Sequence, residues 1–215
     1  GKFRVNHNAT TVFTYDDFFT HSDIHLALRR YLAETSCTSI TLHIYNAETI
    51  ASIFGMEAKV DGMFEDFQPR IEQLKKVLHG KNVLLGMYNA NALGLMGTAS
   101  QLNLIARELG ANNLSDSVGE TEKATHGEEA SWETIISLNP EYMFILDRST
   151  ATGTVDESVM GVREVIENDL IKELDVYKDD KIVYFVEHAN VWYTSTGGVQ
   201  ALNTMLSDLE AALPH

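Results

Sequence analysis

Three short apolar runs, separated by segments of helical length, constrain the fold of this 215-residue chain more than any other feature. The runs cover residues 83–88, 142–146 and 182–186 and read as strands. Apolar residues recur at helical spacing between and after them, at 99–109, 132–138, within 159–174 and at 199–213. Parallel strands need long crossovers, which are usually helices. The alternation therefore predicts an α/β fold with a largely parallel, Rossmann-like sheet of βαβ units.

A long helical pattern precedes this region. It runs from Ala47 to about Leu78 and is interrupted by Gly55, Gly62 and Pro69. A continuous helix of that length would measure roughly 45 Å, long enough to join two lobes. The three helix-breaking residues leave a second interpretation open, in which two shorter helices pack together.

The expected organisation therefore has three parts. They are a reduced or atypical N-terminal lobe at 1–46, a linking helix at 47–79 and an α/β ligand-binding lobe at 80–215.

The charge and the apolar runs exclude several classes of function. A formal net charge of −15 argues against a nucleic-acid partner, because the phosphates would be repelled, so an anionic ligand would need locally placed Arg or Lys. Apolar stretches of about six residues fall far short of the roughly 20 that cross a bilayer. We expect a soluble chain from which any targeting peptide has been removed. Cys37 is the single cysteine, which excludes an internal disulfide and a thiolate zinc site.

Polar segments follow each predicted strand, where a parallel sheet collects its ligands. Asn91 lies in the first segment, Arg148 in the second, and the adjacent Trp192 and Tyr193 in the third. Arg148 could hold an anionic ligand or simply pair with Asp147. In an extended segment the two aromatic side chains would point opposite ways, so that one faces the cleft, although aromatic residues at such positions usually belong to the core.

His126 lies in a polar loop before the helix at 132–138 and on its own reads as a solvated residue. Four segments taken together change that interpretation. They are THG at 125–127, NPEYMFILDR at 139–148, KIVY at 181–184 and WYTSTGG at 192–198. Their order and spacing resemble the C-terminal lobe of the substrate-binding proteins that feed ABC importers for ferric siderophores, and above all the catecholate binders of the enterobactin and petrobactin type. The pattern at 47–78 is similar to the long linking helix of the same family.

The resemblance implies a ligand set. His126 and Tyr193 would complete the coordination of Fe(III) when a siderophore supplies only four catecholate oxygens, and Arg148 would face the negatively charged complex. Fe(III) is a hard ion that prefers oxygen, and an imidazole nitrogen is an acceptable further donor. From their places after the predicted strands, and not from the resemblance, Trp192 and Asn91 are also expected to contact the ligand. The expected protein is not an enzyme but an extracytoplasmic binding protein, periplasmic or lipid-anchored, that delivers its cargo to a permease of the inner membrane.

The chain also departs from the family pattern. Only 46 residues precede the linking helix, and MGTASQLN at 96–103 has no cation where the family often carries an arginine. Three alternatives stay open. The ligand could be haem, a cobalamin or a hydroxamate siderophore on the same fold. The lobe could be a flavodoxin-like enzyme or regulatory domain with His126 as a general base. A homodimer could complete an otherwise half-formed cleft.

Overall fold

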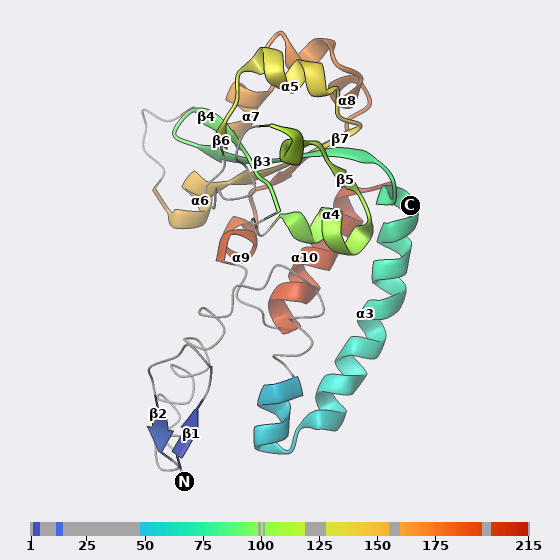
Figure 1. The fold of residues 1–215 in the computed structure, drawn as a ribbon, viewed down its shortest axis with the longest axis vertical. Coiled ribbons are helices and arrows are strands. Elements are labelled where there is room, and N and C mark those ends of the chain that lie inside the picture. Colours follow the sequence, from blue (N-terminus) through green and yellow to red (C-terminus); the bar gives the residue numbers. More distant parts are fainter. Residues whose placement is uncertain are drawn as a thin grey trace.

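A six-stranded sheet is the centre of the fold. The computed structural model describes residues 2–4, 12–14, 48–98, 100, 102–118, 128–154, 160–194 and 199–214. The strands are β3 (Asn82–Asn89), β4 (Ala92–Leu95), β5 (Asn112–Asn113), β6 (Glu128–Glu129), β7 (Tyr142–Asp147) and β8 (Ile182–Phe185). They are arranged in the order β6-β4-β3-β7-β8, and β5 also pairs with β3. β5, β7 and β8 run parallel to β3, whereas β4 and β6 run antiparallel to their neighbours. The predicted α/β class with a mostly parallel sheet is confirmed (Figure 1).

β7 shows why this sheet forms. All six of its residues are buried, as expected for a central parallel strand that is covered by helices on both faces. Successive side chains alternate between two hydrophobic clusters: Phe144 and Leu146 belong to one, Met143 and Ile145 to the other. The sequence therefore builds two cores, one on each face of the sheet.

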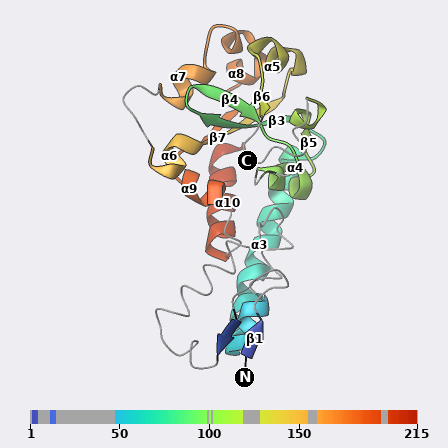
Figure 2. The same ribbon diagram turned by 60° about the vertical axis from the view of Figure 1, so that its left-hand side comes forward.

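Helices cover both faces (Figure 1 and Figure 2). One layer contains α3 (Glu57–Leu78), α4 (Asn103–Leu109), α9 (Ala189–Thr194) and α10 (Val199–Ala212). The other contains α5 (Trp132–Leu138), α7 (Val162–Ile166), η3 (Ile171–Glu173) and α8 (Asp175–Lys178). Two short helices, η2 (Leu114–Ser117) and α6 (Arg148–Thr152), follow strands β5 and β7. Among the helices of the described residues, none combines the length and apolar character that a membrane span requires.

The helical pattern at 47–78 forms two helices, and their role as a link between two lobes stays a prediction. Residues 48–54 are helical, the chain turns at Gly55 with φ +64°, and α3 then continues for 22 residues. Of the three predicted interruptions, Gly62 and Pro69 lie inside α3. At about 1.5 Å per residue α3 is roughly 33 Å long, shorter than the continuous helix that the pattern indicated.

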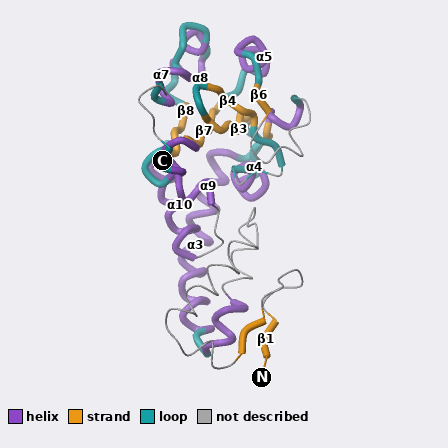
Figure 3. Tube along the Cα trace, turned by 90° about the vertical axis from the view of Figure 1, so that its left-hand side faces the viewer, coloured by secondary structure: helices purple, strands orange, loops and turns teal. Residues whose placement is uncertain are grey.

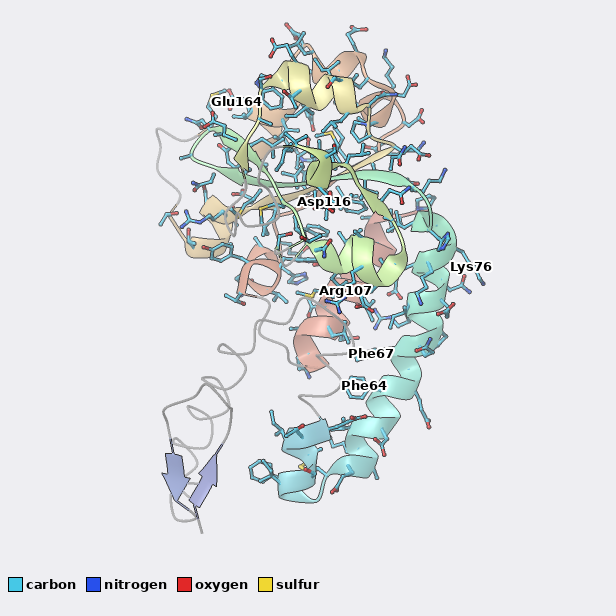
Figure 4. The ribbon with its side chains drawn as sticks, viewed as in Figure 1. Phe64, Phe67, Lys76, Arg107, Asp116 and Glu164 are labelled. Carbon is cyan, nitrogen blue, oxygen red and sulfur yellow. The ribbon has the colours of Figure 1, made fainter. Side chains whose placement is uncertain are left out.

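α3 packs along α10 below the sheet, an arrangement that the tube in Figure 3 shows from the side. Phe67 lies on the side of α3 that faces α10, and the exposed Lys76 lies on the other side (Figure 4). Arg70 fixes the pair. Its Nε and one terminal nitrogen donate to the two carboxylate oxygens of Glu210 at 2.7 Å each. The same guanidinium also donates to Asn203 at 2.7 Å and to Ser207 at 2.9 Å.

The amino-terminal part is described only in part. β1 (Lys2–Arg4) and β2 (Val12–Thr14) form an antiparallel pair with Lys2 opposite Thr14. The rest of the expected lobe at 1–46 lies outside the described residues.

One prediction about the sheet was wrong. The polar segment after β3 was expected to lie at the edge where a parallel sheet collects its ligands, but β3 and β4 form a hairpin with Asn89 opposite Ala92. By Met96, whose N–H donates to Leu85 O at 2.8 Å, the chain has returned to the middle of β3. Only the turn of this segment stays at the edge where ligands are expected.

Candidate functional site

The junction of β7 and α6 delivers Arg148 to the carboxyl edge of the sheet. Asp147, the last residue of β7, is the N-cap of α6: its carboxylate accepts from Thr150 N at 3.1 Å and from Thr150 Oγ1 at 2.8 Å. The cap stops the strand and starts the helix within one residue. Both carboxylate oxygens therefore bond Thr150, one its backbone N–H and the other its hydroxyl, and Arg148 is the first helical residue after the cap.

The Arg148 guanidinium joins three elements. One terminal nitrogen donates to Asn89 Oδ1 at 2.9 Å, and Nε donates to Tyr193 Oη at 3.1 Å. The guanidinium carbon also lies 5.6 Å from the centroid of the Tyr193 ring. Among the described residues the hydrogen-bond partners of Arg148 are an amide and a phenol, and the Asp147 carboxylate bonds Thr150 instead of forming a salt bridge with Arg148.

Sequence reasoning did not single out Asn89. It is the last residue of β3, and its neighbour Tyr88 stands directly opposite Asp147 in the parallel register. The residues that follow this pair along the chain, Asn89 and Arg148, therefore lie side by side at the edge of the sheet. The signal was present in the sequence, because a polar residue that ends a buried strand marks this edge as clearly as Arg148 does.

Asn91 occupies the turn of the hairpin. Ala90 and Asn91 both have positive φ values, 48° and 68°, as a tight two-residue hairpin turn requires. The Asn91 side chain accepts from Met160 N at 2.9 Å and lies 3.0 Å from Tyr88 Oη, which also bonds Met160 O. Burial raises the pKa of Tyr88 above its ordinary value, so this phenol stays a neutral donor. In this structure Asn91 ties the hairpin to Met160, just before the N-cap of α7, and its role as a ligand contact stays a prediction.

Trp192 does not face a cleft. Residues 189–194 form a helix and not the extended segment assumed from the sequence, so the two aromatic side chains are about 100° apart around α9. Trp192 is fully buried, stacks on Phe185 with ring centroids 3.9 Å apart, and donates from Nε1 to Asp208 Oδ2 at 2.8 Å. Tyr193 is half-buried and turned towards Arg148. The structure thus assigns one aromatic side chain to the core and the other to the edge.

His126 lies outside the described residues, so its distance from Tyr193 stays a prediction. Among the residues that are described, no group of three or more His, Cys, Asp or Glu side chains could hold a metal ion. What the described edge offers is a cation and a phenol in contact, in a chain of net charge −15. Such a pair can bind a chelate whose oxygen atoms carry negative charge.

Known proteins resemble this chain in both sequence and fold. The petrobactin-binding protein YclQ of Bacillus subtilis is 30% identical over 170 residues, which are 78% of this chain and 51% of the relative. Its crystal structure superposes with a TM-score of 0.68, at 29% identity, over 79% of this chain and 57% of that one.

Two further crystal structures agree. The iron-uptake substrate-binding protein PiuA of Streptococcus pneumoniae superposes with a TM-score of 0.69 at 26% identity. The match covers 80% of this chain and 59% of the PiuA chain. The periplasmic catecholate-siderophore binding protein VctP of Vibrio cholerae has a TM-score of 0.65 at 25% identity, covering 79% and 58%.

The chain spans about half the length of the curated relatives that it matches. The sequence profile of the family described as periplasmic binding protein matches residues 7–187, which include α3, the parallel strands β3, β7 and β8, and Arg148. The sequence match and the fold agree, and the chain therefore belongs to the periplasmic binding protein family.

Proposed function

We propose that this chain binds Fe(III) complexed with a catecholate siderophore outside the cytoplasm and hands the complex to an ABC permease. The observation that carries the proposal is the contact between Arg148 and Tyr193 at the carboxyl edge of the sheet. The relatives support the choice of cargo, since they are named as binding proteins for petrobactin, ferric anguibactin and a catecholate siderophore. Binding, and not catalysis, is the activity.

The two side chains have complementary roles in this proposal. A phenolate oxygen is a hard donor that suits Fe(III), and the guanidinium offsets the negative charge of the catecholate oxygens. Asn89 accepts from a terminal nitrogen of the guanidinium, and some of the five N–H groups remain for the ligand. Tyr193 and His126 are the proposed protein ligands of the metal, with four donors from the siderophore completing six.

The cargo is tested by titrating the chain with a ferric bis-catecholate and recording the charge-transfer absorption of the iron. We expect saturable binding and a shifted band in the wild type, and loss of that shift in Tyr193→Phe. Tyr177→Phe is the matched control, because Tyr177 lies on α8 and packs on the other face of the sheet. A band that is identical in wild type and Tyr193→Phe would exclude ligation by the phenol.

A hexadentate ferric hydroxamate provides the competing case. Its six donors leave no coordination site for a side chain, so we expect it to bind more weakly than the bis-catecholate. Tighter binding of the hydroxamate, or of haem, would replace the proposed cargo. Turnover of a small phosphate or carboxylate ester by the purified chain would contradict a pure binding function.

A further inference from the structure

α9, the helix that carries Tyr193, is too short to hold its own orientation. It has six residues, and isolated helices shorter than about 12 residues are marginal in water. Its position must therefore come from contacts with other elements. Two such contacts converge on one carboxylate that plays no part in the candidate site.

That carboxylate belongs to Asp208 on α10. Its Oδ2 accepts from Trp192 Nε1 and its Oδ1 pairs with His188 Nδ1, both at 2.8 Å. These are the short distances of hydrogen bonds to a charged acceptor. His188 directly precedes α9 and Trp192 lies in its fourth position, so the two bonds hold the helix at points about one turn apart.

The Trp192 bond fixes the rotation of α9 about its own axis. The indole is fully buried, stacks on the Phe185 ring and donates to Asp208, so a rotation of the helix would break that hydrogen bond or disturb the stack. Tyr193 is the next residue, and at the present rotation its phenol accepts from Arg148 Nε at 3.1 Å. Side chains of a binding site function only within about 0.5 Å and 10–20° of their productive geometry, so a small rotation of α9 is enough to disturb the site.

We infer that Asp208 is a positioning residue of the ligand site: through Trp192 and His188 it sets the orientation of α9, and hence the approach of the Tyr193 phenol to Arg148. Its effect on iron binding rests on the proposed function, but its effect on Tyr193 does not. Groups that orient a metal ligand without touching the metal typically change affinity about 10- to 100-fold when removed.

The test labels the chain with 3-fluorotyrosine and follows the fluorine NMR resonance of Tyr193, assigned by its absence in Tyr193→Phe. We expect Asp208→Asn to shift or broaden this resonance in the unligated chain and to weaken binding of a ferric bis-catecholate about 10- to 100-fold. Trp192→Phe keeps an aromatic ring against Phe185 but removes the donor, so it should produce the same changes even if Asp208→Asn folds poorly.

Ser207→Ala is the matched control. Ser207 is the neighbour of Asp208 on α10, but its hydroxyl accepts a hydrogen bond from Arg70 on α3 and not from α9. The inference is overturned if the Tyr193 resonance is unchanged in both test variants, or if Ser207→Ala moves it as far. If the wild type does not bind the ferric complex while the resonance responds as expected, the positioning role stands and the proposed function fails.

Discussion

Replacing Arg148 with glutamine should weaken binding of an anionic ferric catecholate by a factor that can be worked from its surroundings. Opposite unit charges about 4 Å apart attract by about 4 kcal/mol at the effective dielectric constant near a protein surface. Arg148 is only partly buried, and water screens its charge, so we take about half of this value. About 2 kcal/mol corresponds to a loss of affinity of roughly 30-fold.

Arg148→Lys separates charge from geometry. The lysine keeps the charge but cannot donate to Asn89, Tyr193 and a ligand in the fixed arrangement of a guanidinium. We expect its loss to be about 10-fold, between wild type and Arg148→Gln.

Isothermal titration with a ferric bis-catecholate at about 0.05 M and about 0.5 M salt is the measurement. The wild type should lose affinity with salt more steeply than Arg148→Gln, because the variant lacks the local attraction. Arg163→Gln is the control for net charge. Arg163 lies on α7, pairs with Glu167, and has its guanidinium carbon 4.2 Å from the centroid of the Tyr184 ring. The reasoning is refuted if Arg163→Gln weakens binding as much as Arg148→Gln, since net charge and not local contact would then be responsible.

Three further predictions concern stability. Arg70→Leu leaves the carboxylate of Glu210 without its two hydrogen bonds at 2.7 Å, so the free energy of unfolding in urea should fall by about 2–4 kcal/mol, and much less when Glu210→Gln is already present. The hydrogen bond to Asp208 raises the pKa of His188 above its ordinary value, so their ion pair stabilises the fold below about pH 6.5 and is lost as pH rises through the raised pKa. The difference in free energy of unfolding between wild type and His188→Gln should thus shrink with rising pH. Because the His188 side chain is 43% exposed, the difference should stay below about 1 kcal/mol. A difference that grows with pH would contradict this reasoning. Asn91→Ala should lower the melting temperature more than Asn91→Gly, because both lose the bond to Met160 N but only alanine pays for the φ of 68°; equal losses would argue against strain in the turn.

The strands and most helices could be predicted because their signals are local. The strand at 142–146 is a continuous apolar run, and the helix at 132–138 follows a serine that caps it: Thr134 N donates to Ser131 Oγ at 3.2 Å. Both elements appear where the sequence indicates them. Arg148 and Tyr193, 45 residues apart, were predicted at the same edge because parallel strands end on the same side, and they are in contact.

The sequence-based predictions were wrong or incomplete where contacts between residues far apart in the sequence determine the local conformation. The segment at 189–194 is rich in residues that favour strands, and it is helical because Trp192 is held by Phe185 and Asp208 from other elements. The hairpin at 89–92 contains no glycine, so its turn is not apparent from composition, although asparagine also tolerates positive φ. Nothing local distinguishes Gly55, which interrupts the linking helix, from Gly62, which does not.

The hold of Arg70 on α10 has a mechanical consequence. Glu210, Ser207 and Asn203 form one stripe on α10, so a single guanidinium couples the carboxyl-terminal half of α3 rigidly to the sheet that both helices cover. If residues 48–54 move, the chain must therefore bend between them and Arg70, because α3 beyond Arg70 is held in place. The left-handed backbone at Gly55, roughly 20 Å along the helix from Arg70, is the joint at which bending costs least.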